Sequence, residues 1–377
     1  MTRIRLFTPG PTSVPEEVLL EMAQPVFHHR TAKYQDLLKQ TTAGLQYVFR
    51  TGNQVLTFTG SGTSAMEAGI VCCLPPAAKA LVVRSGKFGE RWAEVCKAYD
   101  RDHINIDVEW GRGVDPAVIA KALAHDPGIR AVIVVHSETS TGAANDVQAI
   151  GRIVASTEAL FMVDGITSAG AIPLEVDKWL IDIAATGSQK ALMLPPGLAF
   201  LSVSDKAWRV AESFQPPAYY LDIKRYRKAL AKLDNPYTPA ITLVAGLAKS
   251  LAMIKAEGLE NIWARTAKIA QATRQAMLAM GLKLFAKDPV DSLTSICYPD
   301  GVDDKKFRNL LRDKFGVWVA GGQDVLAGKI FRISHMGYVD ALDAISVIAA
   351  VEQALIACGF RVVPGTGPAK AQEILSD

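Results

Sequence analysis

A lysine and an aspartate each follow a short apolar run of this chain. Lys190 ends the segment Gly-Ser-Gln-Lys after residues 181–186, and Asp164 follows residues 160–163. Such runs predict buried strands, so both side chains are expected at strand ends. An amine there can form a Schiff base with an aldehyde cofactor, and a carboxylate can keep a pyridine nitrogen protonated. The pair therefore predicts catalysis with pyridoxal phosphate (PLP).

The surroundings of Lys190 fit this chemistry. Residues 191–194, Ala-Leu-Met-Leu, are small and apolar. Burial among them would disfavour the charged ammonium and so make the amine nucleophilic. The alternative interpretation is a solvated lysine that simply follows a strand.

A glycine-rich turn, residues 59–64, opens a predicted helix. The free amides and the positive dipole end of a helix start can bind a phosphate, and the expected contacts are Ser61, Gly62 and Thr63.

The same turn also matches the dinucleotide pattern G-x-G-x-x-[GA], through Gly60, Gly62 and Ala65. An NAD site normally has an acidic residue at the end of the next strand, where this chain has Arg84. An arginine could accept an NADP phosphate, but this alternative leaves the lysine and the aspartate unexplained.

Two further segments carry candidate cofactor contacts. Phe88 stands between glycines and could lie flat on a pyridine ring, although a core phenylalanine is the alternative. Residues 136–142 hold several hydroxyl side chains that could bind the ring hydroxyl. His136 and Glu138 could form an acid–base pair, but a histidine beside a strand end is more often structural, and Lys190 can transfer protons itself.

Arg332 lies within the apolar alternation Ile-Phe-Arg-Ile, on a predicted strand. A planar guanidinium can hold a carboxylate through two hydrogen bonds, and an unpaired arginine is rarely buried. We therefore expect Arg332 to bind a substrate carboxylate; a surface ion pair is the alternative.

Composition restricts the class of partner. The chain has 377 residues, 49% of them hydrophobic, and a formal net charge of +3. So nearly neutral a chain is not typical of nucleic-acid binding, and neither a bilayer-spanning run nor a targeting signal is evident. We expect a cytoplasmic protein that acts on small molecules and binds no membrane. The five cysteines show no paired spacing, which predicts neither a disulfide framework nor a metal site.

The alternation of apolar runs with helical stretches predicts an α/β fold, with a mostly parallel sheet covered on both faces. The expected strands are residues 55–58, 80–83, 104–107, 132–135, 160–163, 181–184 and 198–201. The expected crossover helices are residues 90–99, 116–125 and 147–156. In such sheets the ligand binds beyond the carboxyl ends of the strands, where the candidate residues lie.

A long helical stretch, residues 241–280 with a break at Gly258, leads into a second unit. Its expected strands and helices are residues 292–297, 329–333, 304–315 and 340–358. We therefore predict a large domain and a smaller C-terminal α+β domain, which the N-terminal arm joins. The predicted boundaries are 1–19 for the arm, 20–255 for the large domain and 256–377 for the small one. Residues 364–377 are expected to be a loosely held tail.

These motifs, in this order, resemble the class V aminotransferases of PLP fold type I, and more closely the alanine/serine–glyoxylate aminotransferase group. The likeness covers nearly the whole chain. It rests on residues 8–12, 61–63, 86–91, 136–142, 164–166, 187–190, 237–239 and 331–334.

The resemblance implies a role for each matching position. Lys190 matches the Schiff-base lysine and Asp164 the partner of the pyridine nitrogen. Arg332 matches the arginine that binds the substrate α-carboxylate, and Pro9 and Gly10 lie in a turn across the substrate pocket. The other implied cofactor contacts are Ser61, Gly62, Thr63, Phe88, Thr139, Gln189, Tyr237 and Thr238.

The implied reaction is transamination from alanine or serine to glyoxylate or pyruvate. Tyr237 or Thr238 would come from a second subunit, which implies a homodimer with shared active sites. Arg30 could read a distal carboxylate, which leaves aspartate or another dicarboxylate as an alternative donor, but it could equally pair with Asp36 or Glu21. The chain could also be a PLP lyase of the cysteine desulfurase type, which would need an exposed, mobile cysteine, or a non-enzymatic subunit.

Overall fold

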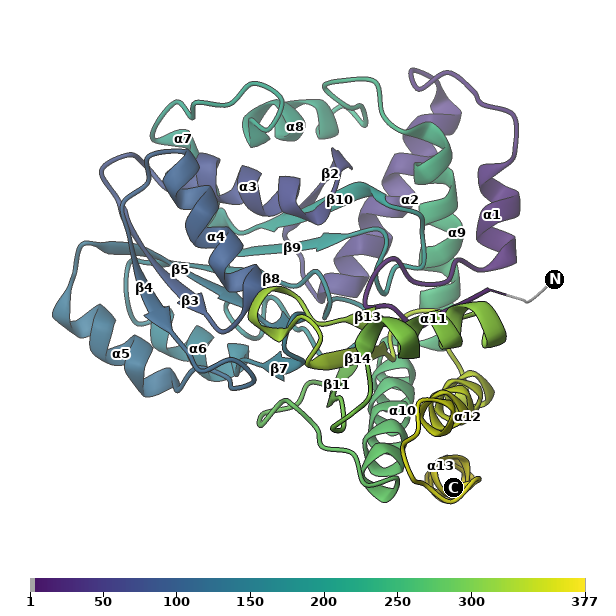
Figure 1. Cartoon of the computed structure of the whole chain (residues 1–377). Helices are drawn as coiled ribbons and strands as arrows, with labels where there is room; N and C mark the ends of the chain where they lie inside the picture. Colours follow the sequence, from purple (N-terminus) through teal and green to yellow (C-terminus); the bar gives the residue numbers. More distant parts are fainter. Residues whose placement is uncertain (1–3, 377) are drawn as a thin grey trace.

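The computed structural model describes residues 4–376. Its centre is a seven-stranded sheet (Figure 1) in the order β2 (Gln54–Gly60), β10 (Gly197–Val203), β9 (Ile183–Gly187), β8 (Leu160–Asp164), β5 (Ile129–Val135), β3 (Lys79–Arg84) and β4 (His103–Asp107). β10 is antiparallel to both neighbours, and the remaining neighbours pair in parallel. All seven predicted strands are present, with ends that differ by a few residues, and the α/β fold is confirmed.

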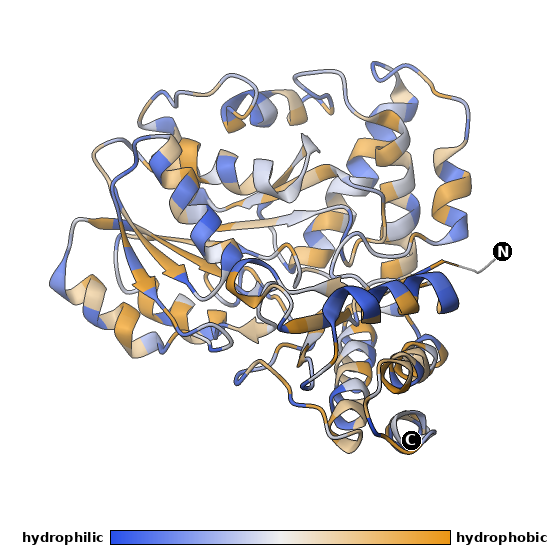
Figure 2. Cartoon of the chain, viewed as in Figure 1, coloured by the Kyte–Doolittle hydropathy of each residue, from blue (hydrophilic) through white to orange (hydrophobic). Residues whose placement is uncertain are grey.

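Both faces of this sheet are covered because its strands are apolar on both sides. In β5, Val132 and Val134 belong to one apolar cluster, whereas Ala131, Ile133 and Val135 belong to another. Figure 2 shows the hydrophobic character of β3 and β5. Since successive side chains of a strand point to opposite faces, the two clusters lie on opposite sides of the sheet.

Each cluster includes its own set of helices (Figure 1). The first takes in α2 (Ala32–Phe49), α5 (Pro116–His125), α6 (Val147–Val154) and α9 (Ile241–Glu257). The second takes in α3 (Gly62–Cys73), α4 (Lys87–Ala98), α7 (Asp205–Glu212) and α8 (Ile223–Leu230). The short helix α1 (Glu16–Met22) packs against α9.

The C-terminal part has an apolar core of its own. Gly258, with φ +85°, separates α9 from α10 (Leu259–Ala279), as the sequence predicted. A three-stranded antiparallel sheet follows, in the order β11 (Leu293–Cys297), β14 (Ile330–Ser334) and β13 (Ala320–Gly321). The helices of this part are α10, α11 (Asp304–Phe315), α12 (Ala341–Ala357) and α13 (Thr366–Leu375). The N-terminal strand β1 (Arg5–Leu6) pairs in parallel with β12 (Val317–Trp318), so the first described residues lie on this part.

The expectation of a loose tail after residue 364 was wrong. Residues 366–375 form α13, which packs against α10 and α12. Glu352 on α12 is buried and accepts hydrogen bonds from the amides of Gly365 (2.6 Å) and Gly367 (2.8 Å), which lie at the start of α13. A carboxylate at a helix N-terminus stabilises it, and here the carboxylate comes from another helix. Asp377 lies outside the described residues.

Candidate active site

Lys190 lies just beyond β9, at the carboxyl end of the central sheet. Its side chain contacts the N-terminal segment, where the ammonium donates a hydrogen bond to the carbonyl oxygen of Pro9. A Cβ atom on Gly10 would lie 2.7 Å from Lys190 Cε, and Gly10 has φ +136°, so only glycine fits here. Burial lowers the pKa of Lys190 to about 8, although the nearby Asp164 opposes this. The neutral, nucleophilic amine is therefore accessible near pH 8.

Asp164 is the last residue of β8 and is 2% exposed. Its carboxylate accepts hydrogen bonds from the amide of Ile166 (2.8 Å) and from the indole N–H of Trp92 (3.0 Å). Burial raises the pKa of Asp164 to about 7; Glu138 also raises it, whereas the two hydrogen bonds lower it. A bound cation, such as a protonated pyridine nitrogen, would stabilise the ionised carboxylate.

Helix α4 brings three side chains to this place. Phe88 and Arg91 line the cavity beside Lys190, and Trp92 is buried against Asp164. The Arg91 guanidinium lies 4.7 Å from the centre of the Phe88 ring. The predicted stacking residue is thus part of the cavity wall, with a cation next to it.

The start of α3 forms another part of the same wall. Ser61, Gly62 and Thr63 line the cavity together with Gln189, and the first amides of a helix have no partner within the helix. Within residues 4–376, the buried Gln189 Oε1 has no hydrogen-bond partner. Arg91 donates a 3.5 Å hydrogen bond to Thr63 Oγ1. Free amides and a guanidinium suit a phosphate group. The Gln189 carboxamide could add a hydrogen bond to an anion only through its NH₂ group, because Oε1 can only accept.

Hydroxyl groups line the cavity near Asp164. Thr139 Oγ1 lies 2.9 Å from Thr167 Oγ1, and Thr167 donates to the carbonyl oxygen of Ser137 at 2.9 Å. Because the single hydroxyl proton of Thr167 is used in that bond, Thr139 is the donor between the two hydroxyls. Rotation of its hydroxyl proton would let Thr139 donate to a ring oxygen instead.

Arg332 lies on β14 and is 5% exposed. Its guanidinium donates to the carbonyl oxygen of Thr139 at 2.7 Å and to that of Gly321 at 2.6 and 3.0 Å. Among the described residues it forms no ion pair. Burial lowers the pKa of Arg332 to about 10, and the Glu138 charge opposes this. A buried guanidinium held only by carbonyl oxygens is suited to bind a carboxylate.

One cavity of about 250 Å³ lies among these groups. Arg332, Pro9 and Gly10 are not in its wall, but Arg332 and Pro9 are hydrogen-bonded to the wall residues Thr139 and Lys190, and Gly10 lies against Lys190. The structure brings together in its wall Ser61, Gly62, Thr63, Phe88, Thr139, Asp164, Gln189 and Lys190. An amine, a buried carboxylate, an aromatic ring and a phosphate-binding helix start are the parts that PLP requires. The residues present therefore fit this cofactor.

Three further residues named from the sequence lie outside the cavity wall and are not bonded to it in the described part of this chain. The Tyr237 hydroxyl donates to the carbonyl oxygen of Tyr219 (2.8 Å), Thr238 is exposed, and neither lines the cavity. Arg30 is exposed in the loop before α2 and does not line the cavity either.

His136 does not line the cavity and makes no acid–base pair with Glu138 there. Its ring packs edge to face against Trp179, with 5.6 Å between ring centres, and burial lowers its pKa to about 4. Arg84, the residue considered for an NADP phosphate, donates to Asp107 at 2.6 Å and also lies outside the cavity.

Sequence reasoning assigned no role to Arg91, Trp92 or Thr167, which the structure places at the site. A signal for two of them was present, because Phe88, Arg91 and Trp92 stand at i, i+3 and i+4 and so share one face of α4. Nothing in the sequence indicated that Thr167 would meet Thr139.

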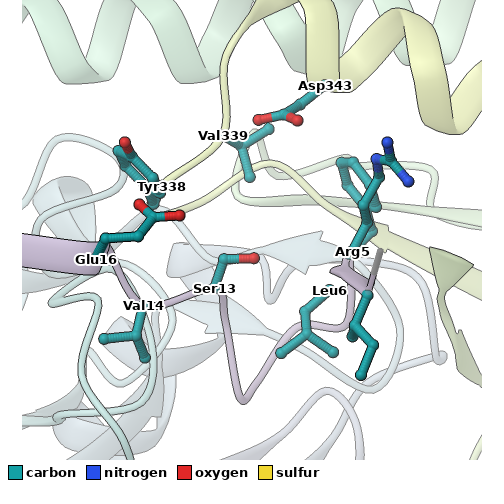
Figure 3. A pocket seen from close by; sticks show the side chains of 10 residues that line it. Arg5, Leu6, Ser13, Val14, Glu16, Tyr338, Val339 and Asp343 are labelled. Carbon is teal, nitrogen blue, oxygen red and sulfur yellow. The ribbon is translucent and has the colours of Figure 1, made fainter. Parts of the chain in front are cut away.

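A second hollow, of about 240 Å³, lies between the N-terminal segment and the start of α12 (Figure 3). Its wall includes Ser13, Glu16, Tyr338 and Asp343, and Lys190 is not part of it.

In the described part of the chain, no group of three or more His, Cys, Asp and Glu residues could hold a metal ion. Nor does any helix there combine the length and apolar character needed to cross a membrane.

Comparison with known proteins extends these findings. Residues 4–344 match the family model described as aminotransferase class-V. The chain is 43% identical to a protein of a Synechococcus strain named "soluble hydrogenase, small subunit", over 98% of both chains. It is 37% identical to L-aspartate–glyoxylate aminotransferase of Paracoccus denitrificans, over 98% of this chain and 95% of that one.

Two further proteins are similar over nearly their whole length. Serine–glyoxylate aminotransferase of Methylorubrum extorquens is 36% identical, over 100% of this chain and 96% of that one. The crystal structure of ureidoglycine–glyoxylate aminotransferase from Bacillus subtilis superposes with a TM-score of 0.96 at 28% identity, covering 100% of this chain and 99% of that chain.

Proposed function

The chain belongs to the class V aminotransferase family, and on that premise we propose that it transfers the amino group of a small L-amino acid, alanine or serine, to glyoxylate or pyruvate. It is a transaminase, and its fold is that of the PLP enzymes of fold type I. The family implies PLP as the cofactor. The observation that carries the proposal is the buried Arg332, which has no ion pair among the described residues and lies close enough to Lys190 to lower its pKa.

PLP, when bound, supplies an aldehyde for the amino group and a ring that accepts electrons from the substrate Cα. Lys190 would hold the aldehyde carbon and Asp164 the ring nitrogen, while Phe88 would lie on the ring and Thr139 would meet its oxygen. The phosphate would be held by Ser61, Gly62, Thr63 and Gln189, with Arg91 beside them.

The chain's own residues then carry out the proton transfers. Arg332 binds the substrate carboxylate and so fixes which Cα bond faces Lys190. The Lys190 amine, with a pKa of about 8, can take the Cα proton and deliver it again. Pro9 and Gly10 lie against the Lys190 side chain, and the Pro9 carbonyl oxygen accepts the hydrogen bond of its ammonium group.

Small donors suit the charges around the cavity. Arg91 and Lys190 are the two cations in its wall, and both have roles toward the cofactor. The neighbouring Lys87 is paired with Glu90 (3.1 Å) and Asp324 (2.8 Å). A second, free cation for a side-chain carboxylate is therefore absent among these residues. The names of two relatives and of the superposed structure contain glyoxylate, which supports this acceptor.

The desulfurase alternative is disfavoured by the cysteines. Burial raises the pKa of all five thiols, including Cys72 and Cys96 to about 12, whereas sulfur acceptance needs a thiolate.

We also propose a cytoplasmic homodimer in which Tyr237 or Thr238 of each chain completes the phosphate site of the other. Support comes from their position outside the cavity of their own chain.

The division into an arm (1–19), a large domain (20–255) and a small domain (256–377) remains a proposal, which the separate apolar cores support.

The test of this function is glycine formation from glyoxylate by the purified, PLP-loaded protein. We expect serine or alanine to be the best donor. Faster turnover with aspartate would show that aspartate is the preferred donor. Sulfide release from cysteine would favour the lyase. Absence of glycine with all three donors would contradict transamination to glyoxylate.

A further inference from the structure

Helix α4 begins without a cap from its own sequence, because its N-cap residue is Gly86. The cap comes instead from Glu138, at the end of β6 (Ser137–Glu138). Its fully buried carboxylate accepts hydrogen bonds from the amides of Gly89 (3.1 Å) and Phe88 (3.4 Å). The hydroxyl of Ser140 accepts a hydrogen bond from the amide of Lys87 (2.9 Å). Residues 138–140 thus occupy the whole helix start.

The carboxylate of Glu138 accepts four hydrogen bonds in all, three at Oε1 and one at Oε2. Besides the two amides of α4, it accepts hydrogen bonds from the amide of Ser140 (3.1 Å) and from its hydroxyl (2.5 Å). A Cβ atom on Gly86 would lie 2.5 Å from Glu138 Cγ, so the two segments are in close contact. The positive end of the helix dipole favours an anion here.

The same three residues also hold the substrate side of the site. The carbonyl oxygen of Thr139, between Glu138 and Ser140, accepts the 2.7 Å hydrogen bond from Arg332. Helix α4 in turn carries Phe88, which lines the cavity, and Trp92, which donates to Asp164. A displacement of Glu138 would therefore move both the ring contacts and the carboxylate-binding arginine.

We propose that Glu138 is a positioning residue for the bound cofactor: its carboxylate fixes the start of α4 and so sets where Phe88 and Arg91 would meet PLP and where Trp92 binds Asp164. The inference rests on the PLP-dependent function proposed above. A glutamine in its place would keep the shape, but its NH₂ group would face an amide N–H, so that two donors oppose each other. The helix start must then shift, and the ring contacts must shift with it.

The test compares Glu138→Gln with Glu352→Gln in the PLP-loaded protein. Glu352 is a matched control because it is also buried and also accepts two amide hydrogen bonds at a helix start, that of α13. Both variants are expected to unfold at lower temperature. Only Glu138→Gln should change the circular dichroism of the visible cofactor band and release PLP about tenfold faster or more.

An unchanged band and release rate in Glu138→Gln would overturn the inference, as would equal effects in the two variants. Should Glu138→Gln not fold, Ser140→Ala provides the second test, since it removes the Lys87 cap and one Glu138 hydrogen bond. It is expected to change the band in the same direction, and an unchanged band would again overturn the inference. If the wild-type protein bound no PLP, the proposed function would fail; if only the variant results failed, the positioning role would fall alone.

Discussion

Arg332 donates a 2.7 Å hydrogen bond to the carbonyl oxygen of Thr139, and so joins the C-terminal sheet to the turn after β6, which follows the central strand β5. The Thr139 hydroxyl lines the cavity that holds Lys190. The residue expected to bind the substrate is thus fixed by the segment expected to bind the cofactor. We therefore expect the alignment of the substrate with the cofactor to depend on the contact between Arg332 and Thr139.

Arg332→Lys is expected to weaken binding of the amino donor. Lysine carries a point charge and cannot hold a carboxylate through two parallel hydrogen bonds. Loss of about 1.5–3 kcal/mol corresponds to a rise in KM of roughly 10- to 150-fold, measured by steady-state kinetics. Arg308→Lys is the control, because Arg308 forms a bidentate pair with Asp304 at 2.5 and 2.7 Å on α11. A KM equal to that of the wild type would argue against carboxylate binding by Arg332.

Arg91→Gln is expected to weaken PLP binding by about tenfold or more, because one charged contact to the phosphate is lost. Pyridoxal, which has no phosphate, should bind both proteins equally well. Arg227→Gln is the matched control, since Arg227 also lies over an aromatic ring, that of Trp208, at 4.4 Å. Titration of the cofactor-free proteins with each compound measures the effect. Equal losses for PLP and pyridoxal would place Arg91 away from the phosphate.

Asp164→Asn is expected to flatten the pH dependence of stability in the cofactor-free protein. The pKa of Asp164 is raised by burial to about 7, from an ordinary value of 3.8. The folded protein favours the neutral carboxyl group of Asp164. This contribution to the free energy of unfolding is therefore greatest below about pH 4 and is lost as the pH rises through 7. Each pKa unit is worth about 1.4 kcal/mol, so the loss approaches roughly 4 kcal/mol by pH 8.

Asparagine cannot ionise. In thermal unfolding, the Tm of the variant should therefore fall less between pH 5 and pH 8 than the Tm of the wild type. At pH 8 we expect the cofactor-free variant to be the more stable protein, although it binds PLP more weakly. A Tm difference between pH 5 and pH 8 that is the same in both proteins would contradict the raised pKa.

Hybrid dimers test whether active sites are shared. Lys190→Ala lacks the amine, and a Tyr237→Phe, Thr238→Ala double variant lacks the contacts assigned to the other subunit. Each protein alone should be nearly inactive. A mixture refolded or co-expressed together should regain activity, because one of the two sites in a hybrid then contains only native residues. Failure to regain activity, with hybrids verified by mass, would place the phosphate site within one chain.

The sequence predicted the residues at strand ends well, because the carboxyl ends of parallel strands meet at one edge of a sheet. Lys190 and Asp164 were predicted in this way. The bond from Trp92 to Asp164 spans 72 residues, and the cap from Glu138 to Gly89 spans 49. Such contacts depend on how α4 packs, and no local pattern indicates them. The same holds for α13, whose cap, Glu352, comes from another helix 13 residues before Gly365.

The central claim is that Lys190 and PLP together move an amino group, and the absorbance spectrum of the PLP-loaded protein tests it most directly. We predict a visible band that disappears when L-serine or L-alanine is added and returns when glyoxylate follows. Lys190→Ala should lack this band and the response, whereas Lys206→Ala, which removes another partly buried lysine, should retain both. A band that neither amino acid changes, or one that survives in Lys190→Ala, would contradict the account.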